Sequence, residues 1–174
     1  MTFTLHTADA HDYDAEAKLI ETTYQNDPDE MQIIKQQLLA LRHERTYTEA
    51  FELVVKDQTN TIVGLGALSD SYILGQPTAR IAILFPLLVA PDYANQGIGR
   101  QLIDELEHRA FVRGYQAVAI TGSPDYLTRF GYQPALDFGI TANPLATGIC
   151  MLRELRPDAL RHFSGKLVYP NALT

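Results

Sequence analysis

The chain has 174 residues, of which 46% are hydrophobic and 20% charged, and its formal net charge is −7. This length and composition are typical of one packed globular domain and exclude a disordered or collagen-like chain, so we expect a single domain over residues 1–174. The negative charge disfavours a nucleic-acid partner, because phosphates would be repelled, and suits a cationic amine.

The chain contains one cysteine, Cys150, which excludes an internal disulfide. No CxxC or His-rich stretch beside it suggests a metal site. The N-terminal residues are polar and acidic, unlike a signal peptide, and no apolar run is long enough to span a bilayer. We therefore expect a cytoplasmic protein with no membrane segment and no metal.

Two helices are predicted near the N-terminus. Residues 9–26 carry apolar side chains at helical spacing, with Asp9 or Asp12 as N-cap, and a second helix begins after residues 26–28 and runs towards residue 42 or 43. Residues 51–69 contain two β-rich runs around a polar turn, which is typical of a hairpin. The polar residues 69–77 predict a second turn.

Residues 80–91 form an apolar run with too little alternation for an edge strand. We predict a central strand covered on both faces. Pro86 lies inside this run and cannot donate a ladder hydrogen bond. A bulge or splay is therefore expected at Pro86, with a gap in the pairing of the sheet.

The second half of the chain continues with helices and strands. An amphipathic helix is predicted over residues 97–113 and a buried strand over residues 115–121. A Ser N-cap followed by Pro opens a short helix over residues 123–129. Residues 149–155 and 165–170 are strand-like, around a helical or turn segment, and could offer an edge for a homodimer.

Residues 95–99, Asn-Gln-Gly-Ile-Gly, lie between the central strand and the amphipathic helix. The first turn of a helix presents unpaired backbone N–H groups and the positive end of the helix dipole, so it attracts anions. Gly97 and Gly99 leave room for a phosphate to approach, and Asn95 tolerates positive φ. A turn without a ligand is nevertheless the commoner meaning of this pentapeptide alone.

Two other phosphate-binding patterns do not fit this loop. A dinucleotide fingerprint would place a third glycine where Leu102 stands, and a P-loop would place Lys and Ser or Thr where Arg100 and Gln101 stand. A dinucleotide-binding oxidoreductase is therefore disfavoured.

The flanks of the loop change its interpretation. The segment PLLVAPDYANQGIGRQLIDELEHRAFVRGYQAVAITGSPDYLTRFGYQPA, residues 86–135, resembles the GNAT superfamily of acyl-CoA-dependent N-acetyltransferases, in the branch similar to bacterial YhbS. The likeness continues through residues 51–68 and 151–173. It implies the GNAT α/β fold: a central mixed, mostly antiparallel sheet, splayed between two central strands and flanked by helices.

The resemblance also implies acetyl-CoA as the co-substrate. In the family, pantetheine pairs with the splayed strand, which here corresponds to Leu87, Leu88 and Val89, and an N–H near Leu88 or Val89 would hold the thioester oxygen. The diphosphate would bind the backbone of Asn95, Gln96, Gly97, Ile98, Gly99 and Arg100. Ala94 stands where the family has Gln or Arg, so a side-chain contribution would come from Asn95, Gln96 or Arg100.

The usual general acid of the family is a Tyr four residues before the Gly of a Gly-Tyr pair, and here that position is Leu127. The adjacent Tyr126 is a candidate acid, although it is turned about 100° around a helix from that position. Residues 79–91 contain no carboxylate, so Asp70 is the candidate base. Tyr72, His6, His43 and Tyr169 could join a substrate pocket, but such lone residues more often serve packing.

These observations predict an N-acetyltransferase that moves the acetyl group of acetyl-CoA to a primary amine of a small molecule or peptide, by direct attack in a ternary complex. Catalysis by proximity, with water taking the proton, is an alternative to a dedicated base. A non-catalytic acyl-CoA-binding or regulatory module is the alternative function. The sequence does not identify the acceptor.

Overall fold

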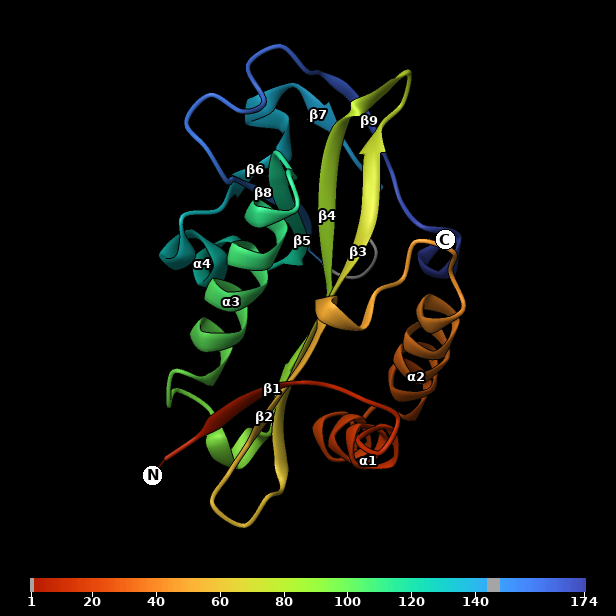
Figure 1. Ribbon diagram of the computed structural model, residues 1–174, viewed down its shortest axis with the longest axis vertical. Coiled ribbons are helices and arrows are strands. Elements are labelled where there is room, and N and C mark those ends of the chain that lie inside the picture. The colour runs from red at the N-terminus through yellow and green to blue at the C-terminus, as the bar shows by residue number, and fades with distance from the viewer. Residues whose placement is uncertain (1, 144–147) are drawn as a thin grey trace. The chain divides into compact units, whose positions relative to one another are not determined.

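The computed structural model describes residues 2–143 and 148–174, and the chain divides into two compact units (Figure 1). The first unit comprises Met1–Leu68 and Phe85–Leu106, and the second comprises Ser69–Leu84 and Glu107–Thr174. Strands β3 (Ile62–Ile73) and β4 (Gln76–Val89) and helix α3 (Ile98–Val112) contribute residues to both units. Within the described residues, no helix has the length and apolar character that crossing a membrane requires.

In the first unit, two helices and a three-stranded antiparallel arrangement come from the first 68 residues. Its remaining elements are β1 (Thr4–Thr7), α1 (Tyr13–Thr23), α2 (Pro28–Arg42), the 3-10 turns Glu49–Phe51 and Pro91–Tyr93, and β2 (Glu52–Lys56). Strand β2 lies between β1 and the first half of β3, in register from Glu52 opposite Ala67. The predicted hairpin and both predicted helices are confirmed.

The two helices begin where capping chemistry allows. At α2, the Asp27 carboxylate accepts a hydrogen bond from the Glu30 N–H at 3.1 Å, and Pro28 occupies the first helical position, at the end of the predicted start segment 26–28. Helix α1 begins at Tyr13, so Asp12, one of the two predicted N-caps, occupies the cap position, although its side chain makes no capping hydrogen bond. Asp9 accepts instead from the His11 N–H at 2.7 Å and so closes a turn ahead of the helix.

One face of the first unit's sheet is covered by α1 and α2. Apolar side chains from both helices meet those of the strands in one buried cluster: Ala8, Leu19, Ile20, Ile34, Leu38, Val54, Ile62, Leu65 and Leu88. The helical spacing of the apolar residues in α1 and α2 therefore has its predicted role.

The opposite face is covered by the first half of α3, which approaches β3 at two glycines. A Cβ on Gly64 would lie 2.6 Å from Cγ2 of Ile98, and a Cβ on Gly66 would lie 2.9 Å from Cδ1 of Leu106. Both distances are too short for real atoms, so a larger residue at either position would force a neighbour to move; at Gly64 that neighbour is the stiff, β-branched side chain of Ile98. Gly64 and Gly66 thus fix the distance between α3 and the sheet.

A buried charge cluster joins α1, α2 and β2. The Arg42 guanidinium donates to the carboxylates of both Glu16 and Glu52, whose side chains are almost fully buried, and the Tyr47 hydroxyl donates to Glu52 at 2.7 Å. The ring of Tyr13 stacks under Arg42, 3.5 Å from the guanidinium carbon. One cation facing two carboxylates cannot neutralise both. Burial and the charge of Glu52 therefore raise the pKa of Glu16 to about 8.

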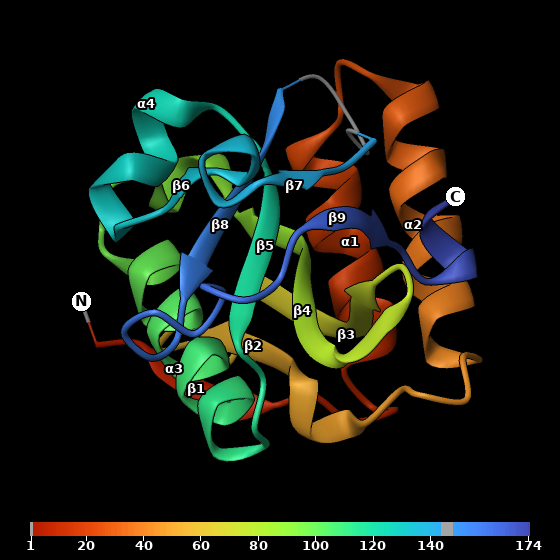
Figure 2. The ribbon, with the colours of Figure 1, turned by 90° about the horizontal axis from the view of Figure 1, so that it is seen from above.

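The second unit is built around a sheet whose strands run in the order β9-β3-β4-β5-β8-β6 (Figure 2). Its elements include β5 (Ala117–Gly122), α4 (Pro124–Leu127), β6 (Gln133–Pro134), β7 (Ile140–Thr141), β8 (Ile149–Glu154) and β9 (Gly165–Val168). Strand β5 runs parallel to β4 over Ile81–Ile83 and antiparallel to β8. Buried Ile81 and Ile83 confirm the central strand.

The turn predicted within residues 69–77 is present, but it is much shorter than that segment. Strand β3 continues to Ile73 and β4 already begins at Gln76, so only Leu74 and Gly75 turn, with Gly75 at φ +76°. The polar residues that suggested a loop have distant partners: Ser71 donates to the Val168 carbonyl at 2.6 Å. The short strands β6 and β7 were not predicted either, because two-residue strands have no periodicity.

The buried cluster predicts a pH dependence of stability. In the unfolded chain Glu16 ionises near its ordinary pKa of 4.5, whereas the folded protein keeps its proton up to about pH 8. Between these values the folded state binds more protons, so the free energy of unfolding should fall with rising pH, by up to about 1.4 kcal/mol per pH unit. Urea unfolding of wild type and Glu16→Gln from pH 5 to 8.5 measures this. The variant should lose this part of the slope, and equal slopes would contradict the assignment.

The contact between Gly64 and Ile98 predicts an energetic coupling. Gly64→Ala should lower the free energy of unfolding by about 1–3 kcal/mol, because the new methyl group overlaps Ile98. In the double variant with Ile98→Ala the obstructing atom is gone, so the loss should be smaller than the sum of the two single losses. A double-mutant cycle by urea denaturation measures this difference, and strict additivity would show that α3 is not held at this distance.

Candidate functional site

The loop ahead of α3 has the backbone that the sequence predicts. Residues Ala94, Asn95, Gln96 and Gly97 are exposed, with Asn95 at φ 60° and Gly97 at φ 83°, both in the left-handed region. A Cβ on Gly97 would meet no described protein atom within 4 Å. Open space therefore lies beside this glycine, and a larger side chain there would be strained and would enter that space.

The first turn of α3 is available to an anion. Its first intrahelical hydrogen bond runs from the Gln101 N–H to the Gly97 carbonyl at 3.0 Å, so the N–H groups of Ile98 and Gly99 have no acceptor within the helix. Helices α1 and α2 carry acidic residues in their first turns, whereas residues 98–101 include none. The positive end of the α3 dipole is therefore not neutralised by its own first turn.

The loop is fixed at its base. The Tyr93 hydroxyl donates to Asp57 in the β2–β3 turn at 2.8 Å, and Thr59 donates to the same carboxylate. These hydrogen bonds, from Thr59 first and Tyr93 second, lower the pKa of Asp57 to about 2. Asp57 is thus ionised at neutral pH and ties the strand that precedes the loop to the neighbouring hairpin.

Gln96 in the loop and Arg100 in the first turn of α3 are both exposed. Gln96 Nε2 is 3.5 Å from the Asp92 carbonyl, and Arg100 Nη1 is 4.0 Å from Asp104 one helical turn away. A hydrogen bond as long as that of Gln96 is weak. The Gln96 side chain can therefore reorient towards a ligand at small cost, in keeping with its predicted contribution in place of Ala94.

The predicted pantetheine contacts at the end of β4 differ in the direction of their backbone N–H groups. The Ala90 N–H donates to the Val63 carbonyl of β3 at 2.8 Å. Because N–H groups alternate in direction along a strand, the Leu88 N–H also points towards β3, whereas those of Leu87 and Val89 point to the other edge. The Leu88 side chain belongs to the buried cluster under α1 and α2. Of the two candidates for the thioester oxygen, this alternation favours Val89.

Pro86 follows Phe85 in a cis peptide, which was not predicted. The register of β4 with β5 covers Ile81–Ile83, within the second unit, whereas Phe85 and Pro86 belong to the first. The gap in pairing expected at Pro86 therefore stays a prediction.

Asp70, the candidate base, lies on β3 with two partners. Its carboxylate accepts from the Tyr115 hydroxyl at 2.7 Å and from Arg80 Nη2 at 3.2 Å, and the Arg80 guanidinium carbon lies 4.0 Å from the centre of the Tyr115 ring. Burial and the hydrogen bond to Asp70 raise the pKa of Tyr115. These contacts connect the β3–β4 hairpin to the end of α3, and they favour a structural role for Asp70.

Tyr126, the candidate acid, and Leu127 point in different directions from α4. Leu127 is 2% exposed and packs against Gly122, whose Cβ would lie 3.1 Å from it. Tyr126 is 43% exposed and packs edge-on against Phe130, with ring centres 5.1 Å apart. The expected separation of these neighbours around the helix is confirmed, and Tyr126 does not take the place of Leu127.

The other titratable candidates differ in environment. His6 is exposed and hydrogen-bonded to Thr4. Burial raises the pKa of the Cys150 thiol, although the neighbouring Tyr169 hydroxyl partly opposes this, so the thiol is protonated at neutral pH. Among the residues that the structure describes, no group of three or more His, Cys, Asp or Glu side chains is arranged to hold a metal ion.

Two features of the site were missed by sequence reasoning. The glycines that position α3 carry a detectable signal, since Gly64 and Gly66 interrupt a strand pattern, as glycines do where a backbone or helix approaches closely. The other feature is an apolar cavity lined by residues 134–136, 140–142 and 148–150. It has no sequence signal, because its lining comes from short strands and turns.

Comparison with known proteins agrees with this geometry. The sequence profile of the Acetyltransferase (GNAT) family matches residues 13–132. The uncharacterized N-acetyltransferase YhbS of Escherichia coli strain K12 is 29% identical over 118 residues, which are 67% of this chain and 70% of that protein.

Two solved structures show the same fold. YhbS from Escherichia coli in complex with CoA superposes with a TM-score of 0.86 at 23% identity, covering 98% of this chain and 91% of that one. A GNAT family acetyltransferase from Brucella melitensis in complex with acetyl-CoA superposes with a TM-score of 0.79 at 20% identity, covering 99% of each. With its helix-flanked, mostly antiparallel sheet and a matched profile over most of its length, the chain belongs to the Acetyltransferase (GNAT) family.

Proposed function

We propose that this acetyltransferase transfers the acetyl group of acetyl-CoA to a primary amine by direct attack in a ternary complex. The observation that carries the proposal is the loop of residues 94–97, which is exposed, left-handed at Asn95 and Gly97, and open beside Gly97. It leads into a helix whose first turn offers N–H groups and contains no acidic residue. This arrangement fits a diphosphate. CoA and acetyl-CoA in the two similar structures support the same ligand.

Each part of the site has a separate task. Acetyl-CoA supplies the activated acetyl group. The backbone of residues 95–100 binds the diphosphate, with Gln96 and Arg100 able to add side-chain contacts. Leu87, Leu88 and Val89 bind pantetheine, and the Val89 N–H donates to the thioester oxygen, where negative charge develops as the amine attacks.

The movement of protons does not need a dedicated side chain. Holding the amine beside the thioester removes a large part of the barrier, and water can take the proton of an amine that is already partly neutral. The exposed Tyr126 and the ion-paired Asp70 remain predictions as acid and base, and their contacts support only small contributions.

The remaining expectations belong to the same proposal. We propose that residues 1–174 act as one catalytic domain, because β3, β4 and α3 each run through both compact units. The acceptor is a small-molecule or peptide amine rather than a nucleic acid, in keeping with the net charge of −7. A cytoplasmic location follows from the need for acetyl-CoA. A homodimer through a late strand stays a prediction.

Gly97→Val tests the diphosphate site. The substitution should weaken CoA binding at least 100-fold by isothermal titration calorimetry, because the side chain strains a left-handed backbone and fills the space for the phosphate. Gly75→Val is the matched control: Gly75 has φ +76°, and its Cβ would also meet no described atom within 4 Å. The control should bind CoA normally. Equal affinities for all three proteins would defeat the assignment.

An assay for the free thiol of CoA tests both turnover and the role of Tyr126 as general acid. Wild type should release free CoA from acetyl-CoA only when a primary amine is present, and Tyr126→Phe should keep at least a fifth of that rate, because the Tyr126 ring is turned away from Leu127. Thermal stabilisation by CoA without thiol release from any amine would indicate a binding module instead. A loss of several orders of magnitude in Tyr126→Phe, with CoA affinity intact, would make Tyr126 the acid.

A further inference from the structure

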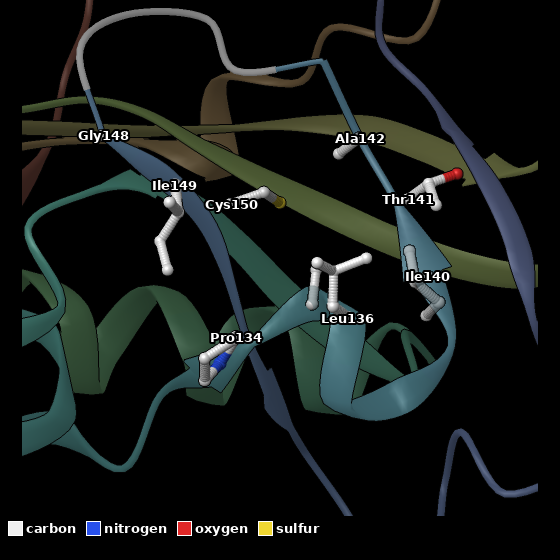
Figure 3. A pocket seen from close by; sticks show the side chains of 9 residues that line it. Pro134, Leu136, Ile140, Thr141, Ala142, Gly148, Ile149 and Cys150 are labelled. Carbon is white, nitrogen blue, oxygen red and sulfur yellow. The ribbon is translucent and has the colours of Figure 1, made fainter.

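An apolar cavity of about 290 Å³ lies within the second unit, between β6, β7 and the start of β8 (Figure 3). Its lining includes Pro134, Leu136, Ile140, Ala142, Ile149 and Cys150. None of the described lining residues is charged, and the cavity is near the lower end of the range for small-molecule sites, about 300–1,000 Å³. It suits a small, uncharged apolar group.

The mouth of the cavity exposes apolar side chains. Leu136 is 71% exposed and Ile149 is 43% exposed, although both lie on the cavity wall. The Cys150 sulfur points inward, into the space between Leu136 and Ala142 (Figure 3). An apolar ligand would remove part of this surface from water, which is the main source of affinity in such sites.

Beyond Cys150 the apolar wall gives way to hydroxyl groups. Cys150 on β8 lies directly opposite Thr121 on β5, so both side chains are on the same face of the sheet. The Tyr169 hydroxyl neighbours the Cys150 thiol closely enough to influence its ionisation. Thr121 Oγ1 and the Tyr169 hydroxyl are both buried, and the Tyr169 hydroxyl lies close to both Thr121 and Cys150. None of these contacts is a well-aligned hydrogen bond, so both hydroxyls retain the capacity to bond a ligand or water.

We propose that this site binds the acceptor, with an aliphatic or aromatic body in the cavity and its amine end directed at the hydroxyls of Thr121 and Tyr169. The inference rests on the proposed acetyl transfer and specifies its substrate class. The uncharged cavity favours an amphipathic primary amine with one polar end over a polyamine, whose second ammonium group would have to be desolvated there without a counter-charge.

The same apolar cavity could instead receive the chain of a longer acyl-CoA. The two possible ligands carry different groups on the apolar body: an amine in the acceptor and a CoA thioester in the acyl donor. Amines and acyl-CoA esters are therefore compared as separate arms of one experiment. Because Cys150 is the only cysteine of the chain, its alkylation by iodoacetamide reports on the cavity alone. The assay needs no turnover, so its result does not depend on the activity of the enzyme.

In this assay the full chain is alkylated at pH 8.5 without acetyl-CoA, and the modified fraction is followed by intact-protein mass spectrometry. Saturating 2-phenylethylamine should slow alkylation at least fivefold, whereas putrescine should leave the rate within a factor of two. Failure of 2-phenylethylamine to protect, or equal protection by putrescine, would overturn the proposal. Protection by hexanoyl-CoA but by neither amine would assign the cavity to the acyl chain and equally overturn it.

Three variants link the cavity to catalysis. Ala142→Phe fills the cavity and should raise KM for 2-phenylethylamine at least tenfold with an unchanged Kd for CoA, while Ala10→Phe, at an exposed position before α1, should change neither. Tyr169→Phe keeps the ring and should raise the same KM at least threefold with less effect on kcat. An unchanged KM in both Ala142→Phe and Tyr169→Phe would refute the acceptor site. If the wild-type protein does not bind CoA at all, the proposed function itself is refuted.

Discussion

The close approach of α3 to β3 is the constraint on which the site depends. Two glycines on one face of β3 let Ile98 and Leu106 pack directly on the backbone, at distances where even one methyl group would not fit. This contact places the first turn of α3 against the sheet. The exposed loop that precedes the helix then begins where β4 ends, and its left-handed residues reverse the chain between the two. The proposed phosphate site is thus a consequence of helix-on-strand packing.

The proposed site works through backbone groups more than through side chains. The loop offers N–H groups and open space, the end of β4 offers alternating N–H groups, and Ala94 and Leu127 stand where the resemblance leads one to expect functional side chains. Backbone donors fixed by packing need no reorganisation when charge develops on a ligand. This explains how a chain without the usual acid can retain the chemistry of its family. Because backbone groups are the same in every residue, specificity for the acceptor must come from the surrounding side chains.

Periodicity predicted most of the fold because burial is periodic. Helices α1, α2 and α3 and the buried strands β2, β4, β5 and β8 all carry apolar residues at the spacing of their element. The prediction failed where partners are distant in sequence. Ser71 and Asp70 suggested a turn, but they lie in a strand because Val168 and Arg80 satisfy them. The ion pairs of Arg42 could not be predicted either, since the two carboxylates come from α1 and β2, far from Arg42 in the sequence.

In the candidate site, too, local features could be predicted from the sequence and features formed by distant residues could not. The loop could be predicted, because glycine spacing and the strand-to-helix transition are local properties that also carry the family resemblance. The acceptor cavity could not, because Leu136, Ile140 and Cys150 come together only through the pairing of short strands.

The most direct test of the diphosphate assignment is the amide ¹H–¹⁵N spectrum of the protein titrated with CoA and, separately, with adenosine 3′,5′-bisphosphate. Backbone N–H groups that bind the diphosphate must shift. We predict the largest shifts at residues 96–100 with CoA, and smaller shifts at the same residues with the nucleotide, which has no diphosphate. Shifts centred elsewhere, with residues 96–100 unmoved by CoA, would contradict the central claim that the first turn of α3 binds the cofactor.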